Sequence, residues 1–177
     1  MGYTLKIGEA ELEYSEDSVG ITCAPVRLDR APAFGELADY QNQRWSPSYR
    51  EWSYDMKALG LTDVMFSERV DGGRGDFEWE GVVRYPLMND YPGVCPVTRE
   101  HVEIVEAKLA AYKALHPGHR AEYPPLKLGV VKNEGYRRVQ DCVDDPAYDI
   151  TLCRGEWLAF WLRWALENCD RPVFVNS

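Results

Sequence analysis

Alternating apolar and polar residues mark the start of the chain. The apolar positions are first Tyr3, Leu5 and Ile7, and after Gly8-Glu9 they become Ala10, Leu12 and Tyr14. A two-residue turn at Gly8-Glu9 explains this change of phase, because it places the two apolar runs opposite each other on one face of a hairpin. The pattern therefore predicts two paired strands here, with further strands at residues 19–23 and 26–28.

Three later segments show the spacing of helices. The first follows Ser46-Pro47, carries an apolar stripe at Tyr49, Trp52, Met56 and Leu59, and stops at Gly60. The second runs from about residue 98 to 115 and ends at His116-Pro117-Gly118. The third, residues 150–168, follows the helix cap Asp149 and is apolar nearly all round, which predicts a place in the centre of the core.

Further strands are predicted between and after the helices. Residues 64–70 and 77–85 read as a hairpin around the glycine-rich loop 71–76, residues 126–131 and 136–143 as another, and residues 173–175 as a last edge strand. Hairpins separated by helices indicate an α+β fold, with an antiparallel or mixed sheet built from hairpins and about three helices packed on it. The length and the lack of a linker favour a single domain over residues 1–177.

The charge is acidic and unevenly placed. The chain has 20 Lys and Arg against 29 Asp and Glu, a net charge of −9, and residues 1–80 account for −8 of it, with 16 acids and 8 bases. Because nucleic-acid affinity comes largely from Lys and Arg, direct binding to nucleic acid is not expected. An acidic surface suits a basic protein partner instead.

The cysteines and the first residues bear on the compartment. There are five cysteines at wide spacings and no Cys-x-x-Cys, so neither a disulfide framework nor a structural zinc site is expected, and buried free thiols are the simplest account. The first residues lack the basic region and apolar stretch of a signal peptide, and no apolar run approaches a membrane span. We therefore expect a cytoplasmic protein that does not bind membranes and has no cofactor.

Residues 40–54 are the best candidate for a binding segment. They combine five aromatic residues with two arginines, and Tyr, Trp and Arg are the residue types enriched at binding hot spots. Two aromatics of the segment belong to the helical stripe, which leaves a candidate binding set of Tyr40, Arg44, Trp45, Arg50 and Tyr54. The alternative is structural, with Tyr40 and Trp45 holding this loop against the sheet.

Two other functions remain open on particular residues. His116 and His119 flank a Pro-Gly turn and would form a metal-assisted hydrolase site if they met the carboxylates of residues 141–149, which are Asp141, Asp144, Asp145 and Asp149. The structural alternative is that the histidines are ordinary loop residues, that these acids form turns and a helix cap, and that there is no metal. The row Glu9, Glu11 and Glu13 raises a third possibility, an acidic decoy of a DNA-binding protein.

The sequence shows no nucleophile elbow and no phosphate-binding loop. The preferred hypothesis is therefore a small soluble protein without catalysis of its own. We expect it to bind a basic protein partner or a small ligand. An accessory protein of a bacterium or phage would fit this profile.

Overall fold

The computed structural model describes residues 3–15, 18–29, 40–46, 49–66, 77–79, 82–84, 86–88, 93–122 and 145–177. The strands are β1 (Tyr3–Tyr14), β2 (Val19–Cys23), β3 (Gln43–Ser46), β4 (Phe77–Trp79), β5 (Val82–Arg84), β6 (Gly93–Pro96) and β7 (Pro172–Asn176). The helices are α1 (Tyr49–Ala58), α2 (Thr62–Met65), α3 (Arg99–Leu115) and α5 (Ile150–Asn168).

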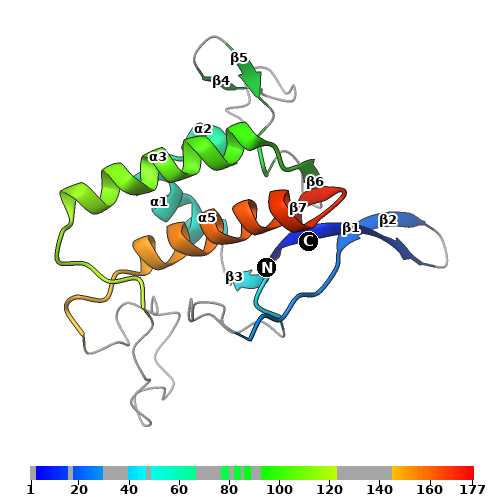
Figure 1. The fold of residues 1–177 in the computed structure, drawn as a ribbon, viewed down its shortest axis with the longest axis horizontal. Helices are drawn as coiled ribbons and strands as arrows, with labels where there is room; N and C mark the ends of the chain where they lie inside the picture. The colour runs from blue at the N-terminus through cyan, green and yellow to red at the C-terminus, as the bar shows by residue number, and fades with distance from the viewer. Residues whose placement is uncertain are drawn as a thin grey trace.

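A five-stranded antiparallel sheet lies at one end of the helices (Figure 1). Its order is β2-β1-β7-β6, and β3 also pairs with β1. β1 is the centre of this arrangement, because different parts of it pair with β2, β3 and β7. β4 and β5 form a separate two-stranded hairpin. The α+β fold predicted from the sequence is confirmed.

Helix α5 lies in the core, as its apolar sequence predicts. Trp157, Trp161 and Leu162 on α5 are buried, and they belong to one cluster with Leu5 and Phe174 of the sheet. Figure 1 shows α3 running alongside α5. The residues of α5 that face solvent are few, so the helix joins the sheet to the other helices.

The predicted helix ends are confirmed where the structure describes them. Thr98 caps α3, since its hydroxyl accepts a hydrogen bond from the His101 amide and its own amide donates to His101 Nδ1. Asp149 caps α5 by accepting from the Thr151 and Leu152 amides. After α1, Gly60 has φ 71°, the left-handed conformation that glycine adopts without strain. Pro47 and Ser48, which precede α1, lie outside the described residues.

The predicted turn at Gly8-Glu9 is wrong. β1 runs without interruption from Tyr3 to Tyr14. The face of the strand that is buried in its first half is opposite to the face that is buried in its second half. Leu5 and Ile7 pack toward the helices, whereas Ala10 belongs to a small cluster on the opposite face. A strand whose two halves bury opposite faces gives the same sequence pattern as a tight hairpin, which explains the error.

Other strand predictions were partly wrong. The last strand, β7, is not an edge strand, because it lies between β1 and β6. Residues 26–28 form no strand, and Val64 and Met65 belong to helix α2, which buries both. β4 and β5 both fall within residues 77–85, which were predicted as one strand, and they pair with each other instead; residues 67–70 of the predicted partner strand lie outside the described residues. The loop 71–76 and the predicted hairpin of residues 126–143 lie outside the described residues.

Candidate functional site

The structure does not gather the five predicted binding residues onto one open surface. Arg44 is only 2% exposed. Arg50 and Tyr54 are exposed on α1 and contact each other, with Arg50 Nε donating to the Tyr54 hydroxyl at 3.0 Å. Tyr40 is exposed as well and lies under the guanidinium of Arg27. The side chain of Trp45 lies outside the described part of the structure.

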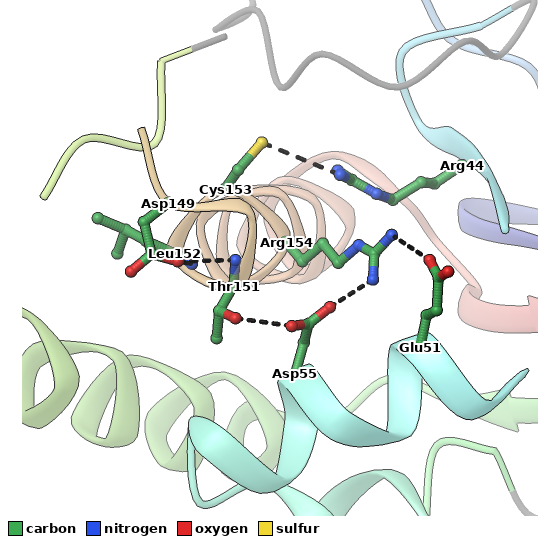
Figure 2. Close-up of polar contacts among 8 residues, drawn as sticks. All are labelled: Arg44, Glu51, Asp55, Asp149, Thr151, Leu152, Cys153 and Arg154. Carbon is green, nitrogen blue, oxygen red and sulfur yellow. Dashed lines mark hydrogen bonds and ion pairs between the residues drawn. The ribbon is translucent and has the colours of Figure 1, made fainter. Parts of the chain in front are cut away.

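Arg44 belongs to a buried polar network around the first turns of α5 (Figure 2). The centre of this network is Arg154, whose guanidinium pairs with Asp55 and lies 3.7 Å from Glu51 on α1. Asp55 also accepts a hydrogen bond from the Thr151 hydroxyl at 2.6 Å. Arg154 and Asp55 are 2% and 1% exposed in their side chains, so the ion pair is fully enclosed.

The other side of the network reaches the sheet. Arg44 comes from β3, and its Nη2 lies 3.9 Å from Cys153 Sγ, while its guanidinium stands 5.7 Å from the centre of the Trp157 ring. Figure 2 shows Arg154 extending from α5 toward Glu51 and Asp55, while Arg44 approaches α5 from β3. Buried charges are retained only when they are paired and hydrogen-bonded. The network therefore fixes α1, β3 and α5 relative to one another, and its enclosure argues against direct ligand binding.

A second polar cluster lies at the cap of α5. Asp149 Oδ2 accepts hydrogen bonds from the Tyr112 hydroxyl at 2.8 Å and from His119 Nδ1 at 2.6 Å. Burial by itself would raise the pKa of Asp149, but the hydrogen bonds from His119, the Leu152 amide and Tyr112 outweigh it and hold that pKa below its ordinary value. Burial and the hydrogen bond to Asp149 both raise the pKa of Tyr112.

The structure thus brings together some of the residues predicted for a hydrolase. His119 Nδ1 contacts Asp149, and the side chain of His119 is 39% exposed. The ring of His116 stacks on that of His119 at 4.7 Å between centroids. Asp145 instead accepts from the Ala147 amide and pairs with Arg120, as a turn residue does.

Within the described residues, no group of three or more His, Cys, Asp or Glu side chains could hold a metal ion. Asp141 and Asp144 lie outside that part of the chain. The capping role predicted for Asp149 is therefore shown, together with a His–Asp contact that sequence spacing alone did not establish.

The strongest surface feature is the hairpin of β1 and β2. Residues 10–14 and 19–23, which we call the arm, extend beyond the rest of the sheet (Figure 1). Leu12 pairs with Ile21 and Tyr14 with Val19, so the four side chains lie on one face. They are 47–72% exposed. This apolar face is continuous with a small cluster at the base of the arm, made of Ala10, Cys23, Val173 and Val175.

The opposite face of the arm is acidic. Glu11 and Glu13 alternate with Leu12 and Tyr14 on β1, and neither forms an ion pair with any residue that the structure describes. Glu9, at the base of the arm, pairs with Arg171 at 3.2 Å. The sequence between Lys6 and Arg27 contains five acids and no Lys or Arg. The arm thus combines a large apolar face with charges of a single sign.

A groove of about 740 Å³ lies between α3 and α5. Its apolar floor includes Leu109, Ala110, Ala159 and Phe160. Two ion pairs cross from one helix to the other along it, Glu106 with Arg163 and Lys113 with Glu156. These exposed ion pairs connect the two helices and account for the charged rim of the groove.

The cysteines of the described residues are free thiols. Cys23, Cys95 and Cys153 are buried and Cys169 is half-buried. Burial raises the pKa of Cys23 to about 12 and that of Cys95 to about 11. A thiolate is the reactive form of cysteine, so these thiols are not suited to nucleophilic catalysis. No helix among the described residues is long and apolar enough to cross a membrane.

Sequence reasoning did not find the arm as a site, although its signal was present. The change of apolar phase after Gly8 fits a tight turn as well as a single strand whose covered face changes. If residues 3–14 form one strand, the apolar residues after Gly8 lie on the side of the sheet opposite the helices. The chain matches no known family model, and comparison with curated proteins and with solved structures found no similar protein.

Proposed function

We propose that the protein is a non-catalytic interaction module that binds a basic protein partner through the arm. The observation that carries this proposal is the exposure of Leu12, Tyr14, Val19 and Ile21 on one face of a projecting hairpin. Contiguous apolar patches rimmed by polar residues are typical of protein interaction sites. The charge of the arm selects the partner, since Glu11 and Glu13 favour Lys and Arg around an apolar centre.

A second copy of this chain is a poorer occupant. The four side chains expose on the order of 400 Å² of apolar surface. Two arms stacked face to face would therefore bury on the order of 800 Å², which is below the roughly 1,200 Å² of a stable interface. Both copies would also carry the same acidic charge.

Differential capture tests the proposal. The wild-type protein and the variant Leu12→Ser/Ile21→Ser are immobilised and exposed to lysate of the cells that make the protein. A matched control, Tyr54→Ser/Leu115→Ser, removes two apolar side chains that are just as exposed but lie on α1 and α3. All three proteins should have the same melting temperature, because the changed side chains are exposed.

The proposal expects basic proteins that the wild type and the control retain and the arm variant loses, with retention falling as salt is raised. Equal capture by the wild type and the arm variant would refute the arm as the binding surface. Loss of capture in the control alone would move the binding surface to α1, where Tyr54 was predicted to act, or to α3 at Leu115.

A second candidate function rests on the 2.6 Å contact between His119 Nδ1 and Asp149. A carboxylate that holds one imidazole nitrogen orients the other for proton transfer, as in many hydrolases. The measurement is the hydrolysis of generic carboxylic and phosphate esters, with and without Zn²⁺ or Mn²⁺, by the wild type and by His119→Ala. Activity that disappears in His119→Ala would favour this candidate. The decoy hypothesis ranks last, since it needs a second row of acids beside Glu11 and Glu13.

A further inference from the structure

We infer that the partner binds by adding an antiparallel strand to the open edge of β2, with apolar residues on the Val19 and Ile21 side and Lys or Arg on the other. This inference deepens the proposed function and rests on it. It concerns the backbone of the arm, whereas the proposed function concerns its side chains.

The direction of the backbone groups follows from the hydrogen bonds at the base of the arm. The Ala24 amide donates to the Glu9 carbonyl at 2.9 Å. In an antiparallel pair the inward and outward directions alternate along the strand. Residues 20, 22 and 24 therefore point toward β1, and the backbone N–H and C=O groups of Val19 and Ile21 point away from it. No residue that the structure describes pairs with these outward groups.

The edge of β2 lacks the features that protect edge strands. Proteins commonly block an exposed edge with a charged side chain, a proline or a bulge. β2 has the sequence VGITC, without charge or proline, and its register with β1 is regular over all five residues. An unprotected edge beside an exposed apolar face is the arrangement used in recognition by strand addition.

The other edge of the arm is less open. Ala10 of β1 donates to the Arg171 carbonyl at 3.0 Å, and the Arg171 guanidinium donates to the Ala10 carbonyl at 3.2 Å. Glu11 and Glu13 also lie on β1 itself. The edge of β2 is therefore the better acceptor of a new strand.

The side chains of β2 fit a partner with alternating residues. Gly20 is opposite Glu13, and a methyl group added at Gly20 would meet only the Glu13 carbonyl oxygen, at 4.0 Å. A partner strand beside β2 would lie two strand spacings, about 10 Å, from β1. A lysine or arginine of that strand can reach Glu13 across Gly20. Thr22 is the next polar position of β2, and its hydroxyl already accepts a hydrogen bond from Lys6 at 3.2 Å. Glu13 is therefore the more open carboxylate of the arm.

A second copy does not satisfy both features of the arm. Two β2 strands paired edge to edge would form a four-stranded sheet, but its apolar face would stay exposed and would double in size. A basic partner that adds one strand and folds over the apolar face covers both. The charge of the arm favours such a partner as well.

The probe for the test is a nine-residue peptide with blocked ends that alternates Lys and Val. In antiparallel addition with Val opposite Ile21, the amides of the Val residues point toward β2 and those of the Lys residues point to solvent. Two further peptides are N-methylated, one at the Val residues and one at the Lys residues. They match each other in charge, side chains and number of methyl groups, and differ in which edge of the peptide can donate hydrogen bonds.

Strand addition predicts that methylation at Val weakens binding to the full-length protein at least ten-fold relative to methylation at Lys. It also predicts that the unmethylated peptide slows hydrogen exchange of the Ile21 amide but not of the Leu12 amide, which faces the other edge of the arm. Equal affinity of the two methylated peptides, or no binding of the unmethylated peptide at 1 mM, would overturn strand addition. Slow exchange at Ile21 that depends on protein concentration without peptide would overturn it too, because a second copy would then occupy the edge.

These failures differ from a failure of the proposed function. Capture that is lost in Leu12→Ser/Ile21→Ser, together with equal binding of the two methylated peptides, would leave the arm as the interaction surface and remove only the strand. Unchanged capture by that variant would remove both.

Discussion

Removing Asp55 should destabilise the protein far more than removing any exposed charge. Asp55→Ala takes away the carboxylate that pairs with Arg154 and accepts from Thr151, and both partners are buried. Arg154 keeps its longer contact to Glu51, at 3.7 Å. Breaking a buried ion pair by deleting one partner typically costs about 3–5 kcal/mol, because a charge stays in the interior without its counterpart. We expect a loss of free energy of unfolding in that range.

Urea denaturation followed by tryptophan fluorescence measures this loss. With a slope of about 2–3 kcal/mol/M for a chain of this size, the midpoint of Asp55→Ala should fall by roughly 1–2.5 M. Arg163→Ala is the control, on the same helix as Arg154, since it breaks the exposed pair with Glu106 and should leave the midpoint nearly unchanged. The double variant Asp55→Leu/Arg154→Met should recover most of the loss, because it removes both buried charges together.

A loss below about 1 kcal/mol for Asp55→Ala would refute the reasoning, since an enclosed ion pair does not tolerate the deletion of one partner at so small a cost. Equal losses for Asp55→Ala and Arg163→Ala would refute it as well. Either result would mean that water reaches Arg154 in the native protein.

Three further predictions concern α5 and the thiols. Gly155→Ala should lower the melting temperature, because its methyl group would lie 2.9 Å from Leu109 and 3.0 Å from Leu59, which are both buried. This clash should outweigh the preference of helices for alanine over glycine, about 1 kcal/mol. Gly118→Ala is the control, since no atom lies within 4 Å of the new methyl group, and it should leave the melting temperature unchanged. Asp149→Asn should destabilise the protein at pH 7. Because folding lowers the pKa of Asp149, its contribution to stability is fully present above the ordinary carboxyl pKa of about 3.9 and is lost as pH falls through the lowered value. The difference between the urea midpoints of wild type and variant should therefore shrink as pH falls below the ordinary value, and a constant difference would contradict this. In the background Cys142→Ser, a thiol reagent at pH 8 should label Cys23 and Cys95 only after urea is added, since burial raises the pKa of both thiols. Labelled positions are located by mass spectrometry of peptides, because Cys169 is half-buried; rapid labelling of Cys23 or Cys95 in the native protein would show that these thiols are open to solvent.

The helices could be predicted from sequence because their signals are local. Thr98 and Asp149 cap helices by bonding to amides two or three residues away, and the stripe of Trp52, Met56 and Leu59 repeats at helical spacing. These features need no knowledge of the rest of the fold. The predicted boundaries of α5 therefore agree with the structure at both ends.

The strands were harder because their environment is set by distant residues. The sequence of β1 shows which positions are apolar, but not which side of the sheet the helices cover. The place of β7 between β1 and β6 depends on pairing partners that are far away in the chain. A pattern of alternation alone does not separate a hairpin from one strand that is buried on different faces.

The candidate sites also divide into features set by local sequence and features set by distant residues. The acidic charge of the arm could be read directly, whereas the exposure of Leu12 and Ile21 could not, because apolar strand residues are usually buried. Arg44 was assigned to a surface on residue type, yet Cys153 and Trp157 surround it, more than 100 residues later. The contact of His119 with Asp149 also joins residues 30 positions apart.

The pairing of β1 with β7 has a consequence for synthesis on the ribosome. Glu9 and its partner Arg171 are 162 residues apart, so the central strand emerges long before the strand that completes its pairing. At about 5–20 residues per second, β1 waits roughly 10–30 s for β7. During that interval an apolar strand is open to aggregation, and alternating charges are a known protection. Glu9, Glu11 and Glu13 place a charge at every second position in the second half of this strand, so β1 carries this kind of protection throughout the interval.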